Sequence, residues 1–255
     1  MQSEMNHYDS AADHIRRSST PTSDPTRALR EPIRQSYLGW LSAIRSAPSP
    51  QRVLDYCAGL GQHTLTLQNE HPRADVVGID ISAKSLQVGI ASAARLAAGK
   101  KRPTFLQMDA HRLDFPDAHF DLVSDFGSLS SLRFDLAMAE IVRVLRPGGL
   151  FVAVETFGHN PLTNLKRRFN VARGTRTTWA SQHILDMEQV SEMRKLFGDF
   201  RVEYHVFFSL LLGGLPFKSE TLSSALGRFD DWFLNRLGFL RKYAFKVVVC
   251  ARKRP

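Results

Sequence analysis

Short apolar runs alternate with amphipathic stretches through the middle of the chain. The apolar runs predict five strands, at residues 52–57, 74–80, 104–109, 120–126 and 150–155. The stretches between them have apolar residues at helical spacing and predict helices at 62–69, 82–99 and 135–146. Ser82 is suited to cap the second helix and Gly99 to close it. Nearly continuous apolar strands that alternate with helices are typical of a parallel sheet covered on both faces, whose ligand binds at the carboxyl ends of the strands.

The flanking regions follow other patterns. Residues 1–30 are rich in Ser, Thr, Pro, Asp and Arg and predict a flexible N-terminal segment. Residues 31–255 are expected to form a single domain, with a first helix that starts at Glu31 and is ended by the prolines of APSP. Its later elements are predicted to be an insertion at about 159–184, a helix from Asp186 to about Leu196, a strand at 200–210, a second insertion at about 211–243 and a final strand at 244–253.

A turn with two glycines follows the first predicted strand. The strand residues Val53 and Leu54 lead to Asp55, and Gly59 and Gly61 follow shortly after. A dinucleotide fingerprint would need glycine or alanine where Thr64 stands, and a phosphate-binding loop of the Gly-Lys-Ser/Thr type is absent. The turn therefore does not favour a phosphate ligand.

The same turn, Asp55-Tyr56-Cys57-Ala58-Gly59-Leu60-Gly61, resembles the D-x-G-x-G-x-G turn of the class I S-adenosylmethionine (SAM)-dependent methyltransferases. Three further segments resemble that family in the correct order: VVGIDIS, LQMDAHRLDFPDAHFDLV and EIVRVLRPGGLFVAVE. Together they cover about Arg52 to Glu155. The resemblance implies a Rossmann-like, doubly wound, seven-stranded sheet, mostly parallel with an antiparallel last strand. It also implies SAM as the cofactor, and no metal.

The resemblance assigns the adenosine half of the cofactor to four residues. Asp80 would accept both ribose hydroxyls, and Ile81 would pack on the adenine face. Asp109 would bind the adenine amino group, and the backbone of Ala110 would bind a ring nitrogen. For both aspartates the alternative is a helix cap or a solvated turn.

The methionine half of the cofactor is assigned to the turn after the first predicted strand and to the fourth strand. Gly59 and Gly61 would let the backbone approach the ligand without a Cβ in the way. Asp55 would organise the turn near the ligand's amino group, and Asp125 would lie near the methionine portion. Again the alternative for both aspartates is a cap or a solvated turn.

Two further cofactor contacts are less direct. Cys57 stands where the family has its first glycine, and we interpret it as a small residue at an ordinary φ rather than a reactive thiol, since nothing argues for a lowered pKa. Tyr8 is predicted to close over the cofactor, as N-terminal tyrosines do in similar enzymes; the alternative is a mobile tail.

The acceptor side is less determined by sequence. His159 follows the fifth strand and is our candidate general base, with a loop histidine bonded to backbone as the alternative. His183 is a weaker candidate of the same kind, whereas His63 and His111 are expected to be structural. Where many relatives carry a histidine pair, this chain has Ser130 and Ser131.

The 211–243 insertion is rich in leucine and phenylalanine. We expect a helical lid over an apolar substrate or an element that packs on the domain edge. A dimer face or membrane contact, with the nearby arginines on the polar side, ranks below these.

Charge and composition refine the picture. The net charge is +9, but the basic residues are scattered and not interleaved with aromatics, so nucleic acid is not the expected partner. The two cysteines provide no disulfide or metal framework. The N-terminal residues lack an apolar signal core, and the longest apolar run, 206–217, is shorter than the roughly 20 residues that span a bilayer, so we expect a cytoplasmic protein.

These features predict a SAM-dependent methyltransferase that modifies an O or N atom of a small, fairly hydrophobic metabolite. An RNA or protein methyltransferase is one alternative, supported by the charge. A non-catalytic SAM-fold binding protein is another, supported by the altered first glycine. The oligomeric state, including a homodimer, stays open.

Overall fold

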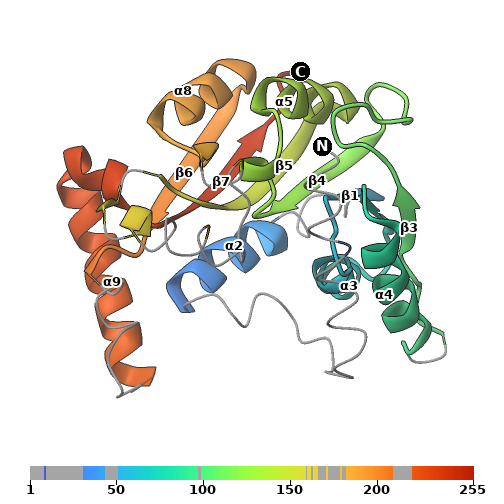
Figure 1. The fold of residues 1–255 in the computed structure, drawn as a ribbon, viewed down its shortest axis with the longest axis horizontal. Coiled ribbons are helices and arrows are strands. Elements are labelled where there is room, and N and C mark those ends of the chain that lie inside the picture. Colours follow the sequence, from blue (N-terminus) through green and yellow to red (C-terminus); the bar gives the residue numbers. More distant parts are fainter. Residues whose placement is uncertain are drawn as a thin grey trace.

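The computed structural model describes residues 9, 31–43, 51–96, 99–158, 160–161, 163–165, 171, 179, 182–208 and 220–255. The fold is a sheet with helices on both faces (Figure 1). Among these residues no helix has the length and the apolar character needed to cross a membrane.

Seven strands form one sheet in the order β3-β2-β1-β4-β5-β7-β6. Their bounds are β1 Arg52–Tyr56, β2 Asp75–Asp80, β3 Thr104–Gln107, β4 Phe120–Phe126, β5 Leu145–Thr156, β6 Asp199–His205 and β7 Lys246–Arg252. Strands β1 to β5 pair in parallel, whereas β7 runs antiparallel to both of its neighbours. The predicted seven-stranded sheet with an antiparallel last strand is therefore confirmed.

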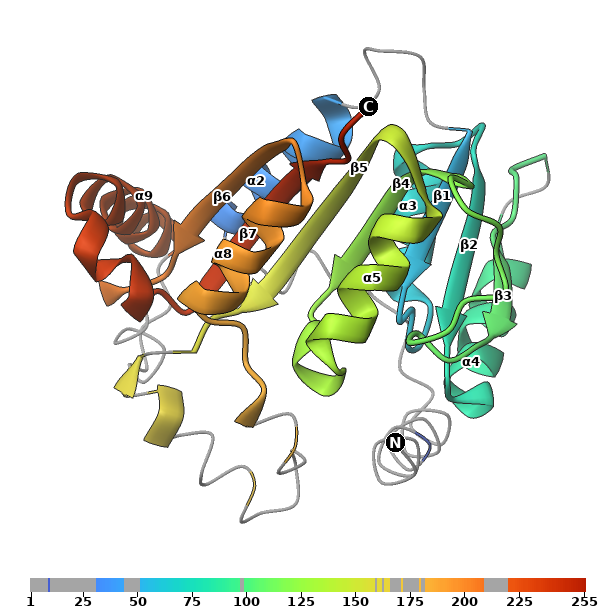
Figure 2. The ribbon, with the colours of Figure 1, turned by 90° about the horizontal axis from the view of Figure 1, so that it is seen from above.

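Helices cover both faces of the sheet. Their bounds are α2 Glu31–Ala43, α3 Gln62–Glu70, α4 Ala83–Ala94, α5 Phe134–Val144, α8 Met187–Leu196 and α9 Glu220–Arg236, with short 3-10 turns η3 Leu129–Ser131 and η5 Gly238–Tyr243. Figure 2 shows α5 and α8 in front of the sheet, with α2 and α3 behind it and α9 beyond the β6 edge. The described part of the second insertion packs against β6 and α2 at that edge. A lid over the acceptor stays a prediction.

The core divides at the sheet into two apolar layers. Along β5, Phe151 and Ala153 face the α5/α8 layer, whereas Val152 and Val154 face the layer that includes α2 and α3. Because successive strand residues point to opposite faces, a strand buried on both sides must be apolar throughout, which is the pattern that the sequence shows.

Some predicted boundaries are wrong. Helix α4 ends at Ala94 and not at Gly99. Strand β5 begins at Leu145, before the Pro-Gly-Gly that we expected to precede it, because Leu145 already pairs with Phe120 of β4. The register then shifts, and the next pair is Leu122 with Leu150. The predicted caps are confirmed: Ser82 accepts from Ser85 N, and Asp186 forms a capping box at the start of α8.

Candidate functional site

The described residues that we predicted to bind the cofactor lie around one edge of the sheet. Asp80 is the last residue of β2, Asp125 lies near the end of β4, and the glycine turn and Asp109 directly follow β1 and β3. Since these strands are parallel, their carboxyl ends meet at the same edge. The sheet order 3-2-1-4 therefore brings together residues that are far apart in sequence.

The turn after β1 has a left-handed backbone at three positions. Cys57, Gly59 and Gly61 have φ values of 59°, 52° and 75°. A Cβ on Gly61 would lie 2.6 Å from Gly89 Cα and 2.7 Å from the Phe105 ring, so glycine is required there for packing. A Cβ on Gly59 would meet nothing within 4 Å. The turn backbone at Gly59 therefore has free space beside it, as a ligand would need.

Our interpretation of Cys57 as a residue with ordinary φ is wrong. Its φ of 59° lies in the left-handed region, where a side chain costs free energy and glycine does not. The absence of a reactive thiol is supported, because burial raises the pKa of Cys57 well above its usual value and the charge of Asp80 adds to that effect. The thiol is therefore protonated near neutral pH.

Asp80 joins the glycine turn to the start of α4. Its carboxylate accepts hydrogen bonds from Gly59 N and Ser82 N, both at 2.8 Å. Burial raises the pKa of Asp80, and the two backbone donors oppose that shift. The side chain keeps partial exposure, as does that of Ile81 beside it. The carboxylate is thus fixed in place with part of its surface open to a ligand.

Asp109 is held by His111, two residues further along the loop after β3. One oxygen, Oδ1, accepts from His111 N at 2.9 Å and lies 2.8 Å from His111 Nδ1. His111 Nε2 in turn accepts from Arg133 N, so its proton lies on Nδ1 and the ring is structural, as expected. Among the described residues Asp109 Oδ2 accepts no hydrogen bond, and the side chain is 36% exposed. A ligand donor can therefore reach it.

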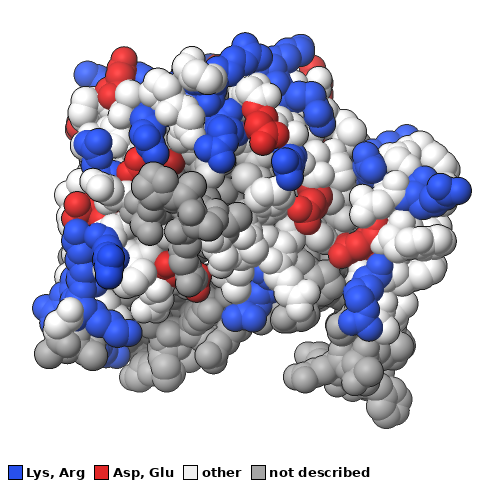
Figure 3. Space-filling model, turned by 180° about the vertical axis from the view of Figure 1, so that it is seen from behind, with Lys and Arg blue, Asp and Glu red and all other residues white. Residues whose placement is uncertain are grey.

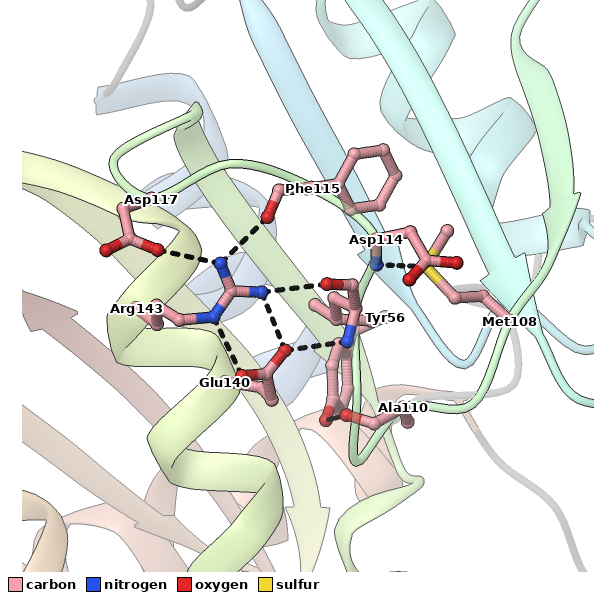
Figure 4. Close-up of polar contacts among 9 residues, drawn as sticks. Tyr56, Met108, Ala110, Asp114, Phe115, Asp117, Glu140 and Arg143 are labelled. Atoms are coloured by element: carbon pink, nitrogen blue, oxygen red, sulfur yellow. Dashed lines mark hydrogen bonds and ion pairs between the residues drawn. The ribbon is translucent and has the colours of Figure 1, made fainter.

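A clamp on α5 that our sequence reasoning missed holds this loop. Arg143 donates to Leu113 O, Phe115 O and Asp117, and pairs with Glu140, at 2.8–2.9 Å (Figure 4). Glu140 also accepts from Leu113 N at 2.7 Å, and the Arg143 guanidinium lowers its pKa. The sequence signal was the EIVR segment, whose Glu and Arg lie three residues apart on one helix face.

The loop has a second anchor at Ala110. The Tyr56 hydroxyl, at the end of β1, donates to Ala110 O at 2.5 Å (Figure 4). Burial raises the pKa of Tyr56, so the phenol remains a donor. The carbonyl of Ala110 is thus occupied.

Asp55 lies beneath the turn and does not face open space. It is 1% exposed, and its two oxygens lie 2.6 Å from His63 Nδ1 and 2.5 Å from Thr64 Oγ1. The hydroxyl of Tyr37 on α2 forms hydrogen bonds with His63 Nε2 and, at 2.6 Å, with Ser124 Oγ. This buried chain supports Asp55 as an organiser of the turn and His63 as structural.

Asp125 and Glu155 form a buried acidic pair at the ends of β4 and β5. Both side chains are fully buried. Burial raises the pKa of Asp125 well above its usual value, and the negative charge of Glu155 raises it further. Asp125 accepts from the Ser128 hydroxyl, and Glu155 accepts from Leu129 N at 2.7 Å. The pair therefore holds a proton and fixes the start of η3.

Of the remaining candidates, the structure describes His183, Ser130 and Ser131. Tyr8 and His159 lie outside the described residues, so their roles stay predictions. His183 stacks on Trp179 with its Nδ1 2.9 Å from Trp179 O, which fits the structural alternative. Ser130 is buried within η3 and Ser131 ends it.

Comparison with known proteins connects this site to a family. Residues 53–149 match the family model described as a methyltransferase domain. The chain is 37% identical over 123 residues to demethylmenaquinone methyltransferase of Deinococcus radiodurans, covering 46% of this chain and 49% of that protein. It is 37% identical over 138 residues to ubiquinone/menaquinone biosynthesis C-methyltransferase UbiE of Methylobacterium nodulans, covering 51% and 54%.

Solved structures support the fold. Phosphoethanolamine N-methyltransferase 2 of Haemonchus contortus, in complex with S-adenosyl-L-methionine, aligns with a TM-score of 0.57 at 20% identity, covering 87% of this chain and 52% of that one. The chain spans about half the length of the curated relatives that it matches. The matched residues 53–149 contain the glycine turn, Asp80, Asp109 and the Arg143 clamp.

Proposed function

This chain contains a methyltransferase domain of the class I, SAM-dependent type, and from that premise we propose that it transfers a methyl group from SAM to a small, hydrophobic, quinone-type acceptor. The observation that carries the proposal is the geometry at the strand ends. Two fixed, partly exposed carboxylates, Asp80 and Asp109, flank a glycine turn whose backbone is open at Gly59.

The residues at this edge fit the cofactor. Asp80 and Asp109 are acceptors, which suits the ribose hydroxyls and the adenine amino group, both of which donate. The clamp of Arg143 and Glu140 holds the loop that carries Asp109 and Ala110. When bound, SAM supplies a methyl group on a sulfonium, which is a good leaving group. The part of the protein is to position the acceptor and to exclude water.

Carbon is the acceptor atom that the relatives favour. One relative is a ubiquinone/menaquinone biosynthesis C-methyltransferase, and our expectation of O or N methylation finds no support there. A ring carbon becomes nucleophilic when a neighbouring hydroxyl loses its proton, so a general base is needed. His159 remains our proposal for that base. A cytoplasmic location also remains part of the proposal.

The first test is calorimetric titration of the full chain with SAM, S-adenosylhomocysteine and, as a control, NAD. We expect binding of the first two and none of NAD. Asp80→Asn should weaken SAM binding by about tenfold or more, the value of a charged hydrogen-bond acceptor. Asp75→Asn, at the other end of β2 in an exposed pair with Lys101, should leave binding unchanged. If Asp80→Asn binds SAM normally, the assigned cofactor site is wrong.

The second test addresses the acceptor. Reduced demethylmenaquinone analogues are incubated with the protein and SAM labelled at the methyl group, and the product is analysed for a new carbon–methyl bond. Cofactor binding without transfer to these analogues would overturn the quinone-type acceptor alone. RNA, protein and other metabolites would then be screened, and a failure of all would favour the non-catalytic alternative.

A further inference from the structure

Helix α9 is fixed to the sheet edge by its inner face. Gly227, Asp230 and Leu234 are buried there. The carboxylate of Asp230 accepts hydrogen bonds from the backbone N–H groups of Phe207 and Phe208, at 2.9 and 2.8 Å. The orientation of the helix is therefore determined by polar contacts to the chain that follows β6, and its opposite face must point outward.

The outward side is aromatic. Phe229 and Trp232 on α9 are 44% and 61% exposed, and Phe239 on η5 is 71% exposed. The outer face of a helix in a globular protein is normally polar. Three large exposed aromatic rings on adjoining elements therefore indicate an interaction surface.

Basic residues accompany these rings. Arg228 and Arg236 each lie one helical turn from Trp232, before and after it, on the same side of α9, and Lys242 is exposed on η5. Among the α9 side chains that the structure describes, the most exposed ones include no acid; Asp231 is 28% exposed and pairs with His205. Figure 3, which views the molecule from behind, shows Lys and Arg on the lobe at the right edge, where α9 of Figure 1 comes to lie. We name this set of Arg228, Phe229, Trp232, Arg236, Phe239 and Lys242 the aromatic–basic face.

We propose that the aromatic–basic face is a docking surface for an anionic lipid bilayer. Aromatic rings, tryptophan above all, favour the boundary between headgroups and acyl chains, and arginine and lysine beside them are attracted to anionic headgroups. A protein partner of complementary chemistry would need acidic residues beside an apolar pocket. An anionic bilayer presents negative headgroups above an apolar interior over its whole surface. This proposal rests on the residues of the aromatic–basic face and does not depend on the acceptor proposed above.

The test is flotation of the full chain with vesicles of phosphatidylcholine, with and without phosphatidylglycerol, at low and high salt. We expect binding to the phosphatidylglycerol vesicles and its weakening at high salt. Arg236→Ala should reduce the vesicle affinity about fivefold. Trp232→Glu should reduce it further, because it places a negative charge at the interface. Ile90→Glu, which changes an apolar side chain on α4 that is 52% exposed against 61% for Trp232, is the matched control and should bind as the parent protein does.

Circular dichroism and titration with SAM accompany each variant. A Trp232→Glu variant that folds and binds SAM normally but no longer floats supports the surface; in that case a failure of the methyl-transfer assay concerns only the acceptor. The proposal is overturned if the parent chain does not bind anionic vesicles, or if Trp232→Glu binds them undiminished. It is also overturned if light scattering shows a dimer that Trp232→Glu dissolves, since the face would then join two copies.

Discussion

At the scale of single residues, Cys57 combines an unfavourable backbone with a position at the centre of the site. Its left-handed φ of 59° is one that glycine adopts without strain. The thiol is protonated and packs against the larger apolar layer. The left-handed backbone at Cys57 therefore destabilises the fold, whereas the packing of its side chain stabilises it. A pair of substitutions can separate the two effects.

Cys57→Gly and Cys57→Ala both remove the thiol but differ at the backbone. We expect the glycine variant to be more stable than the alanine variant by about 1 kcal/mol, the cost of a Cβ in the left-handed region. Urea denaturation of both variants measures this difference. Equal stabilities would mean that the turn rearranges when the thiol is removed.

Asp125 gives a prediction about pH. Because its pKa is raised in the folded protein, the folded state holds a proton that the unfolded state releases at lower pH. The stabilisation that this proton provides is complete below the unfolded pKa, about 3.9, and is lost as the pH rises through the raised folded value. At alkaline pH the ionised pair with Glu155 then destabilises the fold.

Asp125→Asn removes that repulsion and retains an amide of similar shape. We expect the variant to be more stable than the parent by at least about 1 kcal/mol at pH 8, and the advantage to shrink as the pH falls toward 5. Calorimetric melting at both pH values tests this, with the exposed Asp114→Asn as the control. A constant difference across the pH range would contradict the raised pKa.

At the scale of elements, the loop after β3 owes its position to α5. Arg143 uses its guanidinium nitrogens to hold two loop carbonyls, Asp117 and Glu140 together. A lysine has one nitrogen and cannot span these acceptors. The loop and the helix are thus one unit, although they occupy opposite ends of the segment 108–143.

Arg143→Lys should therefore affect both stability and cofactor binding. We expect a loss of about 2 kcal/mol in unfolding free energy, as for charged hydrogen bonds that are removed. The Kd for SAM should rise about tenfold, because binding must then order the loop. Thermal melting and calorimetric titration measure the two effects. Arg146→Lys, in a more exposed pair with Asp121, should change stability by less than about 1 kcal/mol. A normal Kd in a folded Arg143→Lys variant would show that the clamp does not position the loop.

At the scale of the whole molecule, the two surfaces of interest lie on different parts of the sheet. The proposed cofactor residues gather at the carboxyl ends of β1, β2, β3 and β4, within residues 53–149, which match the methyltransferase domain. The aromatic–basic face lies beyond β6, outside the matched residues. The determinants of the acceptor and of the location of the protein are therefore to be sought outside residues 53–149.

The sequence by itself determined the alternation of strands and helices, the glycine turn and the aspartates at the strand ends. These features are local: burial on both faces makes a strand apolar, and a carboxylate needs only to follow its strand to reach the shared edge. Only the tertiary structure decided what Asp55, Cys57, Asp125 and Arg143 do. Their roles depend on backbone angles and on partners from distant segments, such as Tyr37 beside His63 and Glu155 beside Asp125, which no spacing along the chain encodes.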